Sequence, residues 1–545
     1  MAISAYAVIP GRSRFPIRLG FSPTPFAVAA ALICVAPIGA LLAISFGGAS
    51  EHLRHLADTQ LGLYAWNSAA LAVMTAIGTV VLGVPAAWLV ARYRFPGRSF
   101  FSWGLALPLA MPAYVAAYAW VSMTAAGGPV YAASGGALLT VRGLIGAAFV
   151  FSFAYYPYVF LLARQAFETH GTGAADAART LGAGPFRSFT EVALPLARPA
   201  IMAGVALAVM ETLADYGAVD FLGAPTFTVG IIRAWGSFGE PAAAAQLALI
   251  LLFAMMLLFG VERAARRRRS IAERGGRNHP PPRMTLSPAK AWLAFALCLA
   301  PLAIGLIVPG GRLVQLAIET EVLRFPADAL RGTLILATAS GLIAAMLGLG
   351  AAYAARTGGV FARGAVRAAH AGYAIPGAVG ALGVLALLAF VQSMADVGLG
   401  AAAPAIAGGG VLALLFAYQA RFAAAAIGPA ESALARIPPS LDHAARTLGA
   451  RPGGVILRVH LPLAFGGIAT AALLVFIEVM KELPATMILR PIDFETLAVT
   501  AHNYASDERL AQAALPSLLL VAIGLPAMII VARLVSGVGR SEAAH

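Results

Sequence analysis

Four carboxylates stand at the far ends of two otherwise apolar stretches of the chain. Glu211 and Asp215 end one stretch, and Glu478 and Glu482 end the other. Each pair is spaced i, i+4, so both carboxylates of a pair are expected on one face of a helix. An ionisable group at membrane depth costs at least ~2.5 kcal/mol on insertion scales, so such groups usually face a cavity or a partner. Carboxylate oxygen suits a hard cation.

Two interpretations of these acids stay open. In the first, the four carboxylates ring a pathway and favour a cationic substrate, whereas an anion pathway would need Arg or Lys. In the second, they are interfacial helix-end residues that contact a substrate-binding protein or pair with basic residues such as Lys481, Arg233 or Arg490.

The sequence offers no other site chemistry. No Cys/His cluster has metal-ligand spacing, and no Gly-Lys-Ser/Thr phosphate loop occurs. We therefore expect no catalytic residue, no metal site and no cofactor in this chain.

The composition is that of an integral membrane protein. Hydrophobic residues make up 60% of the 545 residues and charged residues only 11%, where a soluble domain has about 25%. The net charge of +14 does not indicate nucleic-acid binding, because the basic residues form short clusters between apolar runs, as orientation signals do. The expected surroundings are a lipid bilayer, with no nucleic-acid partner.

Twelve stretches are candidates for membrane spans of about 20 residues each. Two of them begin near residues 199 and 463 and end at the acids, and Pro108 and Pro112 interrupt another. The sequence thus predicts an all-α, polytopic protein. The ten charge-free stretches are 26–46, 64–90, 101–123, 143–163, 242–261, 291–309, 332–354, 371–394, 400–420 and 510–532.

The basic residues predict the orientation. With the N-terminus inside, most of the 38 Lys and Arg residues fall on the cytoplasmic side, from Arg12, Arg14 and Arg18 onward. Arg421 is counted among them, as the first residue of a cytoplasmic segment. Both chain termini are therefore expected in the cytoplasm.

The second half of the chain repeats the first. Residues 177–183 and 444–450 both read Ala-Ala-Arg-Thr-Leu-Gly-Ala, and Glu211 matches Glu478 at the same offset. Six spans per half is an even number, so the halves enter the membrane in the same orientation and form a parallel repeat. We place the halves at 1–275 and 276–545, joined by the proline-rich linker 278–283.

The repeated segment lies in a polar loop. Ala177–Leu181 and Ala444–Leu448 are predicted as short helices that stop at Gly182 and Gly449, residues suited to a C-terminal cap. A second short helix follows, so each loop is expected to form a compact cytoplasmic knob.

The loop pattern resembles the cytoplasmic signature of permease subunits of ATP-binding-cassette importers. That signature reads acid-Ala-Ala, three residues, Gly, nine residues, an aliphatic residue, one residue, Leu-Pro. The second copy departs at the acid, where His443 stands and Asp442 precedes it. The matching residues are Asp176, Ala177, Ala178, Gly182, Val192, Leu194 and Pro195 in the first copy and Ala444, Ala445, Gly449, Val459, Leu461 and Pro462 in the second.

This resemblance implies the partners. Each loop would contain a coupling helix that inserts into a cleft on an ATPase, so one chain would bind two copies of a cytoplasmic ATP-binding subunit, and ATP would be hydrolysed there. An outer-face substrate-binding protein would deliver the substrate.

The whole chain resembles the ferric-iron permease group of these importers. The segments that resemble it are 210–217 in the first half, with 481–486 and 489–491 in the second. Thiamine and polyamine permeases share much of the pattern and are the alternative. A secondary transporter is a further alternative, which would predict inverted repeats. The resemblance implies a multi-pass protein of the bacterial plasma (inner) membrane.

Overall fold

The computed structural model describes residues 23–46, 57–136, 140–272, 283–320, 325–399 and 410–541. Most of these residues are helical, and the only strands among them are β1 (Tyr93–Arg94) and β2 (Met284–Thr285), which pair in parallel. The all-α prediction is confirmed. The N-terminal arginines, the boundary near 275 and the linker residues 278–282 lie outside the described residues.

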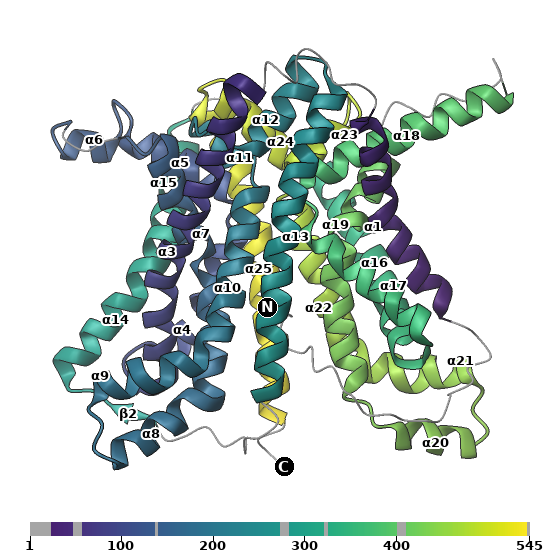
Figure 1. The fold of residues 1–545 in the computed structure, drawn as a ribbon. Helices are drawn as coiled ribbons and strands as arrows, with labels where there is room; N and C mark the ends of the chain where they lie inside the picture. The colour runs from purple at the N-terminus through teal and green to yellow at the C-terminus, as the bar shows by residue number, and fades with distance from the viewer. Residues whose placement is uncertain are drawn as a thin grey trace.

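Eleven helices in the described part of the chain are long and apolar enough to cross a membrane. The helices are arranged side by side, with the two predicted loops at the same end of the bundle (Figure 1). Most predicted spans therefore correspond to single helices. These helices are α1 (Thr24–Ser45), α3 (Gly62–Arg92), α7 (Gly143–Ala166), α10 (Leu194–Ala214), α13 (Pro241–Ala272), α14 (Pro288–Leu302) continued through η7 (Ala303–Ile307) into α15 (Val308–Glu319), α16 (Ala327–Thr357), α18 (Gly377–Leu399), α19 (Val411–Ala435), α22 (Leu461–Met480) and α25 (Leu510–Ser541).

The predicted span 101–123 is a bent pair of helical segments. Arg98–Ala110 and Ala113–Ala133 meet at 87°. The break lies before Pro112, because proline disfavours a helical conformation in the preceding residue, and Met111 is extended (φ −93°, ψ 119°). Counting the pair as one span gives the predicted total of twelve. It comprises α4 (Arg98–Gly104), η2 (Leu107–Ala110), α5 (Ala113–Thr124) and α6 (Pro129–Ala133).

The tenth predicted span, 400–420, is displaced toward the C-terminus. Residues 400–409 lie outside the described residues, and α19 runs from Val411 to Ala435. Arg421 is therefore inside a membrane-spanning helix, and its assignment to a cytoplasmic segment was wrong. The prediction ended the span at the first charged residue, but the charge of Arg421 is balanced by carboxylates from other segments.

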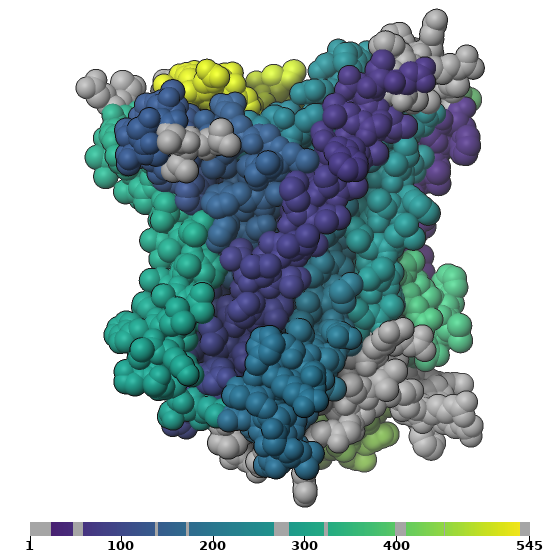
Figure 2. All heavy atoms as spheres, turned by 60° about the vertical axis from the view of Figure 1, so that its left-hand side comes forward, coloured from purple at the N-terminus to yellow at the C-terminus, as the bar shows by residue number. Residues whose placement is uncertain are grey.

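The first span of each half packs against the other half. Helix α1 contacts α16, α17 (Val360–Ala371), α18 and α19, and the Cys34 thiol donates to the carbonyl oxygens of Ala369 (3.6 Å) and Ala420 (3.3 Å). In return, α14 contacts α3 and α4, and Figure 2 shows α14 beside the lower part of α3. The two halves are thus interlocked.

Close packing of α1 on α18 depends on Gly383. A Cβ at this position would stand 2.6 Å from the carbonyl oxygen of Pro37. We expect Gly383→Val to push α1 away and expose the neighbouring Cys34, which is 1% exposed. Alkylation by a maleimide, followed by mass spectrometry, measures this exposure.

The chain contains its own control for that experiment. Cys298, the other buried cysteine, lies on α14 and should stay unreactive. Gly380→Val, on the same face of α18 but with only Ile375 at 3.5 Å, should leave Cys34 protected. Equal reactivity of Cys34 in the Gly383→Val and Gly380→Val proteins would contradict the packing argument.

Candidate functional site

A pocket of about 50 Å³ lies where α10 of the first half meets α19 and α22 of the second. This volume holds a few water molecules or a small ion. All four predicted acids line it. Glu211 is roughly 25 Å along α10 from Leu194, so the pocket lies well away from the two repeated loops. Its charged lining residues are Glu211, Asp215, Glu478, Glu482, Arg421 and Lys481.

The acids do not meet in the predicted way. Helix α10 ends at Ala214, so Asp215 is extended (ψ 138°) and no longer shares a helical face with Glu211. Likewise α22 ends at Met480, before Glu482. The i, i+4 inference was wrong because each helix breaks between its two acids.

The second acid of each pair begins a new short helix. The Asp215 carboxylate accepts the backbone N–H of Ala218 at 2.8 Å, ahead of α11 (Gly217–Phe221). The Glu482 carboxylate accepts the N–H of Ala485 at 3.1 Å, at α23 (Pro484–Leu489). A carboxylate at this position satisfies a free N–H group of the first helical turn.

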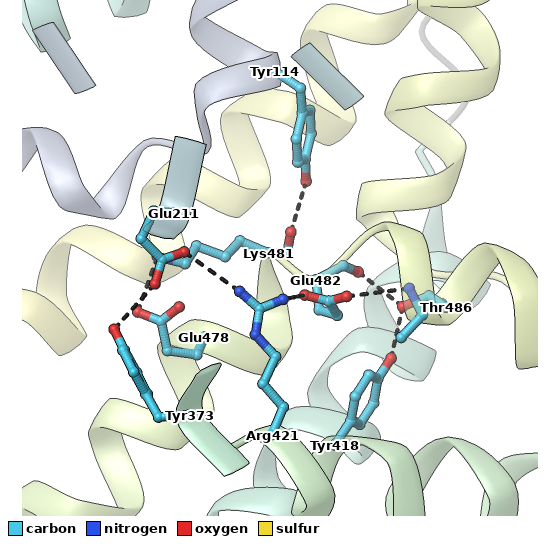
Figure 3. A network of polar contacts seen from close by, with 10 residues as sticks. Tyr114, Glu211, Tyr373, Tyr418, Arg421, Glu478, Lys481, Glu482 and Thr486 are labelled. Carbon is cyan, nitrogen blue, oxygen red and sulfur yellow. Dashed lines mark hydrogen bonds and ion pairs between the residues drawn. The ribbon is translucent and has the colours of Figure 1, made fainter. Parts of the chain in front are cut away.

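Arg421 connects two of the acids across the halves (Figure 3). Its Nη1 donates to Glu482 at 3.1 Å and its Nη2 donates to Glu211 at 3.4 Å. The Tyr373 hydroxyl donates to the other oxygen of Glu211 at 3.1 Å. Neither Arg421 nor Tyr373 was predicted as a site residue. The apolar run Phe422–Ile427 after Arg421 was the available signal that the helix continues.

The pairing hypothesis for the acids is correct for one predicted partner. Lys481 pairs with Glu478 at 3.0 Å. Arg490 instead pairs with Glu495 at 2.6 Å, and Arg233 is not among the residues that line the pocket. The two interpretations of the acids are therefore compatible. The four carboxylates line one pocket, and most of them are paired with basic residues there.

The acids repeat between the halves, but the bases do not. At the corresponding positions of the first half, Tyr158 replaces Arg421 and Ala214 replaces Lys481. Four carboxylates and two cationic groups leave a formal charge of two negative on the pocket.

Both predicted knobs have their first short helix and its glycine end (Figure 1). The predicted second short helix is not separate, because it runs without a break into the following membrane helix, over Pro185–Ala214 in the first half and Gly453–Met480 in the second. Gly182 (φ +92°) and Gly449 (φ +81°) adopt the left-handed conformation expected of helix-ending glycines. Next to them, Leu181 is 89% exposed and Leu448 is 88% exposed. The helices of the knobs are α8 (Thr172–Thr180), α9 (Pro185–Arg187) and η4 (Ser188–Ala193) in the first, and α20 (Pro439–Thr447), α21 (Pro452–Val455) and η10 (Ile456–His460) in the second.

An Arg–Asp pair holds each knob to a membrane helix. Arg92 of α3 donates to both oxygens of Asp176, and these hydrogen bonds lower the pKa of the Asp176 carboxyl. Arg356 of α16 pairs with Asp442 at 3.4 Å. The one-residue shift from His443 to Asp442 in the second copy therefore preserves the contact.

The second knob has further buried partners. His460 Nε2 is hydrogen-bonded to Asp442, and His460 Nδ1 to the Tyr353 hydroxyl. The corresponding residues of the first half are Ala193 and Leu89, which cannot form these bonds. The Asp442 side chain is 4% exposed, whereas that of Asp176 is 39% exposed.

Comparison with known proteins gives a family match in both halves. Residues 79–270 and 344–540 each match the family described as binding-protein-dependent transport system inner membrane component. One match falls in each predicted half.

Individual relatives differ in the substrate that their names give. The chain is 24% identical to the Fe(3+)-transport system permease protein FbpB 2 of Haemophilus influenzae over 85% of this chain and 88% of that protein. It is 31% identical to the sulfate transport system permease protein CysT of Salmonella typhimurium over 46% of this chain and 91% of that protein. It is 34% identical to the molybdenum transport system permease protein ModB of Escherichia coli over 28% of this chain and 69% of that protein.

Proposed function

The chain belongs to the binding-protein-dependent transport system inner membrane component family, with two fused permease domains, and from this premise we propose that it imports ferric iron by coupling to ATPases on separate subunits. The observation that supports the coupling is the pair of matched knobs. The first helix of each knob ends at a left-handed glycine beside an exposed leucine, and an Arg–Asp pair anchors each knob.

The proposed complex follows from this duplication. Each knob seats in one copy of a cytoplasmic ATP-binding subunit, which binds and hydrolyses the ATP. An outer-face binding protein delivers the substrate to the pocket. The chain lies in the bacterial inner membrane with both termini in the cytoplasm, which is the orientation that its basic residues favour.

Two observations support a ferric cargo. The relative that aligns over most of this chain has a name that gives Fe(3+) as its substrate. The pocket has two more carboxylates than cationic groups, and carboxylate oxygen suits a hard ion. Thiamine and polyamines remain the alternative cations.

An oxyanion is a second candidate cargo. Arg421 and Lys481 line the same pocket, and the relatives named for sulfate and molybdenum align with parts of the chain. Both basic side chains, however, already pair with carboxylates. We therefore favour the cation.

Purification of the tagged chain from its native membranes in detergent tests the coupling. An ATP-binding subunit should copurify. In proteoliposomes with the binding protein, uptake of labelled ferric iron should require ATP, while labelled sulfate and molybdate stay outside. Transport by the purified chain with no ATP-binding subunit would exclude the proposal.

Removing two of the pocket carboxylates should reduce iron uptake. We expect the double variant Glu211→Gln, Glu478→Gln to lower uptake at low substrate by about tenfold, equivalent to ~1.4 kcal/mol, with the ATP-binding subunit still bound. Glu495→Gln, which removes an acid outside the pocket, is the control. Unchanged uptake in the double variant would remove these acids from the pathway.

A further inference from the structure

We propose that Arg421 is an ionic latch between the two halves: it holds Glu211 and Glu482 together in the closed pathway, and the halves separate only when its contact with Glu211 breaks. This inference rests on the proposed function, because it assumes that the pocket lies on the transport pathway. Figure 3 shows the guanidinium between the two carboxylates.

The two ion pairs of Arg421 differ in what they connect. Arg421 and Glu482 both belong to the second half, whereas Glu211 lies on α10 of the first half. When the halves move apart along the pathway between them, a pair across the halves must break, while a pair within one half persists. The 3.4 Å contact to Glu211 is therefore present only while the two halves are together, whereas the 3.1 Å contact to Glu482 is permanent.

The permanent contact is physically necessary. A guanidinium does not lose its proton in a protein, and a single buried charge without a partner is strongly destabilising. Arg421 is 12% exposed and Glu482 is 6% exposed, so Arg421 remains paired with Glu482 after Glu211 is released. Gly377 makes room for this pair, since a Cβ there would stand 2.1 Å from Glu482 Oε1.

Release of Glu211 also creates a site for the cargo. In the closed pocket Glu211 is occupied by Arg421 and by the Tyr373 hydroxyl. Once Arg421 withdraws with the second half, a cation can take its place on Glu211. A cationic cargo thus stabilises the separated halves, whereas an anion gains nothing at Glu211.

The lack of symmetry agrees with a latch. If Arg421 only neutralised the acids of its own half, the repeated acids of the first half would need an equivalent base. The first half has Tyr158 at that position, so one arginine serves a carboxylate from each half.

The test measures ATP hydrolysis by the full complex in lipid, without binding protein. A latch that holds the pathway closed keeps this basal rate low. We expect Arg421→Gln and Glu211→Gln each to raise the basal rate about fivefold or more, the lower end of a typical coupling between sites. The basal rate of the double variant Arg421→Gln, Glu211→Gln should be no higher than that of either single variant, because both single variants remove the same contact. Glu482→Gln, which leaves the contact across the halves in place, should raise it less.

Arg490→Gln is the matched control. It breaks an arginine–glutamate ion pair of 2.6 Å that lies within the second half and outside the pocket, and should leave the basal rate unchanged. If the complex with Arg421→Gln fails to assemble, the Glu211→Gln variant tests the proposal by itself, because Arg421 stays paired with Glu482 in that variant.

The possible failures are distinguishable. A wild-type chain that captures no ATP-binding subunit would contradict the proposed function. A wild-type complex that hydrolyses ATP, together with an unchanged basal rate in Glu211→Gln, would overturn the latch alone. Additive increases in the double variant would also overturn it.

Discussion

Replacing both Gly182 and Gly449 with valine should abolish capture of the ATP-binding subunit in detergent. Both glycines have positive φ, +92° and +81°, and a left-handed conformation costs a residue with a Cβ roughly 1–2 kcal/mol. No atom lies within 4 Å of a Cβ built at either position. The effect therefore comes from the backbone alone, through the ends of α8 and α20.

The backbone change redirects the exposed side chains beside each glycine. Leu181 and Leu448 are exposed beside the two glycines. A change in how each helix ends therefore moves these leucines away from the cleft of the ATP-binding subunit that the knob is proposed to enter. Two sites at 1–2 kcal/mol each predict at least about a 30-fold loss of bound subunit, since 1.4 kcal/mol is a factor of ten. Quantitative immunoblotting of the copurified subunit per chain measures the loss.

A glycine outside both knobs controls for backbone strain. Gly239 has φ +64° and no atom within 4 Å of its Cβ position, but it precedes α13 and belongs to neither knob. Gly239→Val should retain the subunit. Retention of the subunit by the double knob variant would show that the helix ends are not the docking element.

Local signals in the sequence predicted the knobs well. The glycine stops and the first short helices depend on residues within a few positions of each other, and the structure has them in both halves. The second short helix was predicted as a separate element, but it is continuous with the membrane helix that follows. Most spans were equally predictable, because a membrane helix is recognised from the apolar length of one segment.

Contacts between distant segments were not predictable in the same way. Arg421 joins Glu211 across 210 residues of sequence, and no local pattern in α19 indicates this partner. The break after Ala214 was also hidden, because Asp215 continues the helical spacing in sequence while its backbone leaves the helix. The exchange of α1 between the halves has the same cause, since a nearly uniform apolar helix has no distinct face to indicate its neighbours.

Arg356→Met should destabilise the chain far more than Arg92→Met, although the two arginines occupy equivalent positions. Arg356 donates to the carbonyl oxygens of Leu434 (2.6 Å) and Ile437 (3.1 Å) as well as to Asp442. Its loss leaves these acceptors and the buried Asp442 carboxylate without their cation. Breaking a buried pair in this way costs ~3–5 kcal/mol.

In the first half, Arg92→Met leaves a carboxylate that water can reach. The Asp176 side chain is 39% exposed, so the pair is worth closer to the ~1 kcal/mol at the upper end for exposed pairs. Thermal unfolding of both variants in detergent, followed by fluorescence-detected gel filtration, compares them directly. Equal shifts in the unfolding temperature would contradict the assignment of the difference to burial.

A second substitution distinguishes the cost of the unpaired Asp442 charge from the cost of lost packing around Arg356. In the Arg356→Met background, Asp442→Asn removes the buried negative charge while keeping a side chain that His460 can hydrogen-bond. If the unpaired charge is the main cost, this second substitution should restore much of the lost stability, whereas the matching Asp176→Asn in Arg92→Met should restore little.

The knobs have the same sequence at their tips, but the second is fixed by a buried network that includes Tyr353 and His460. A force applied equally to both should therefore reach the second half through the stiffer connection.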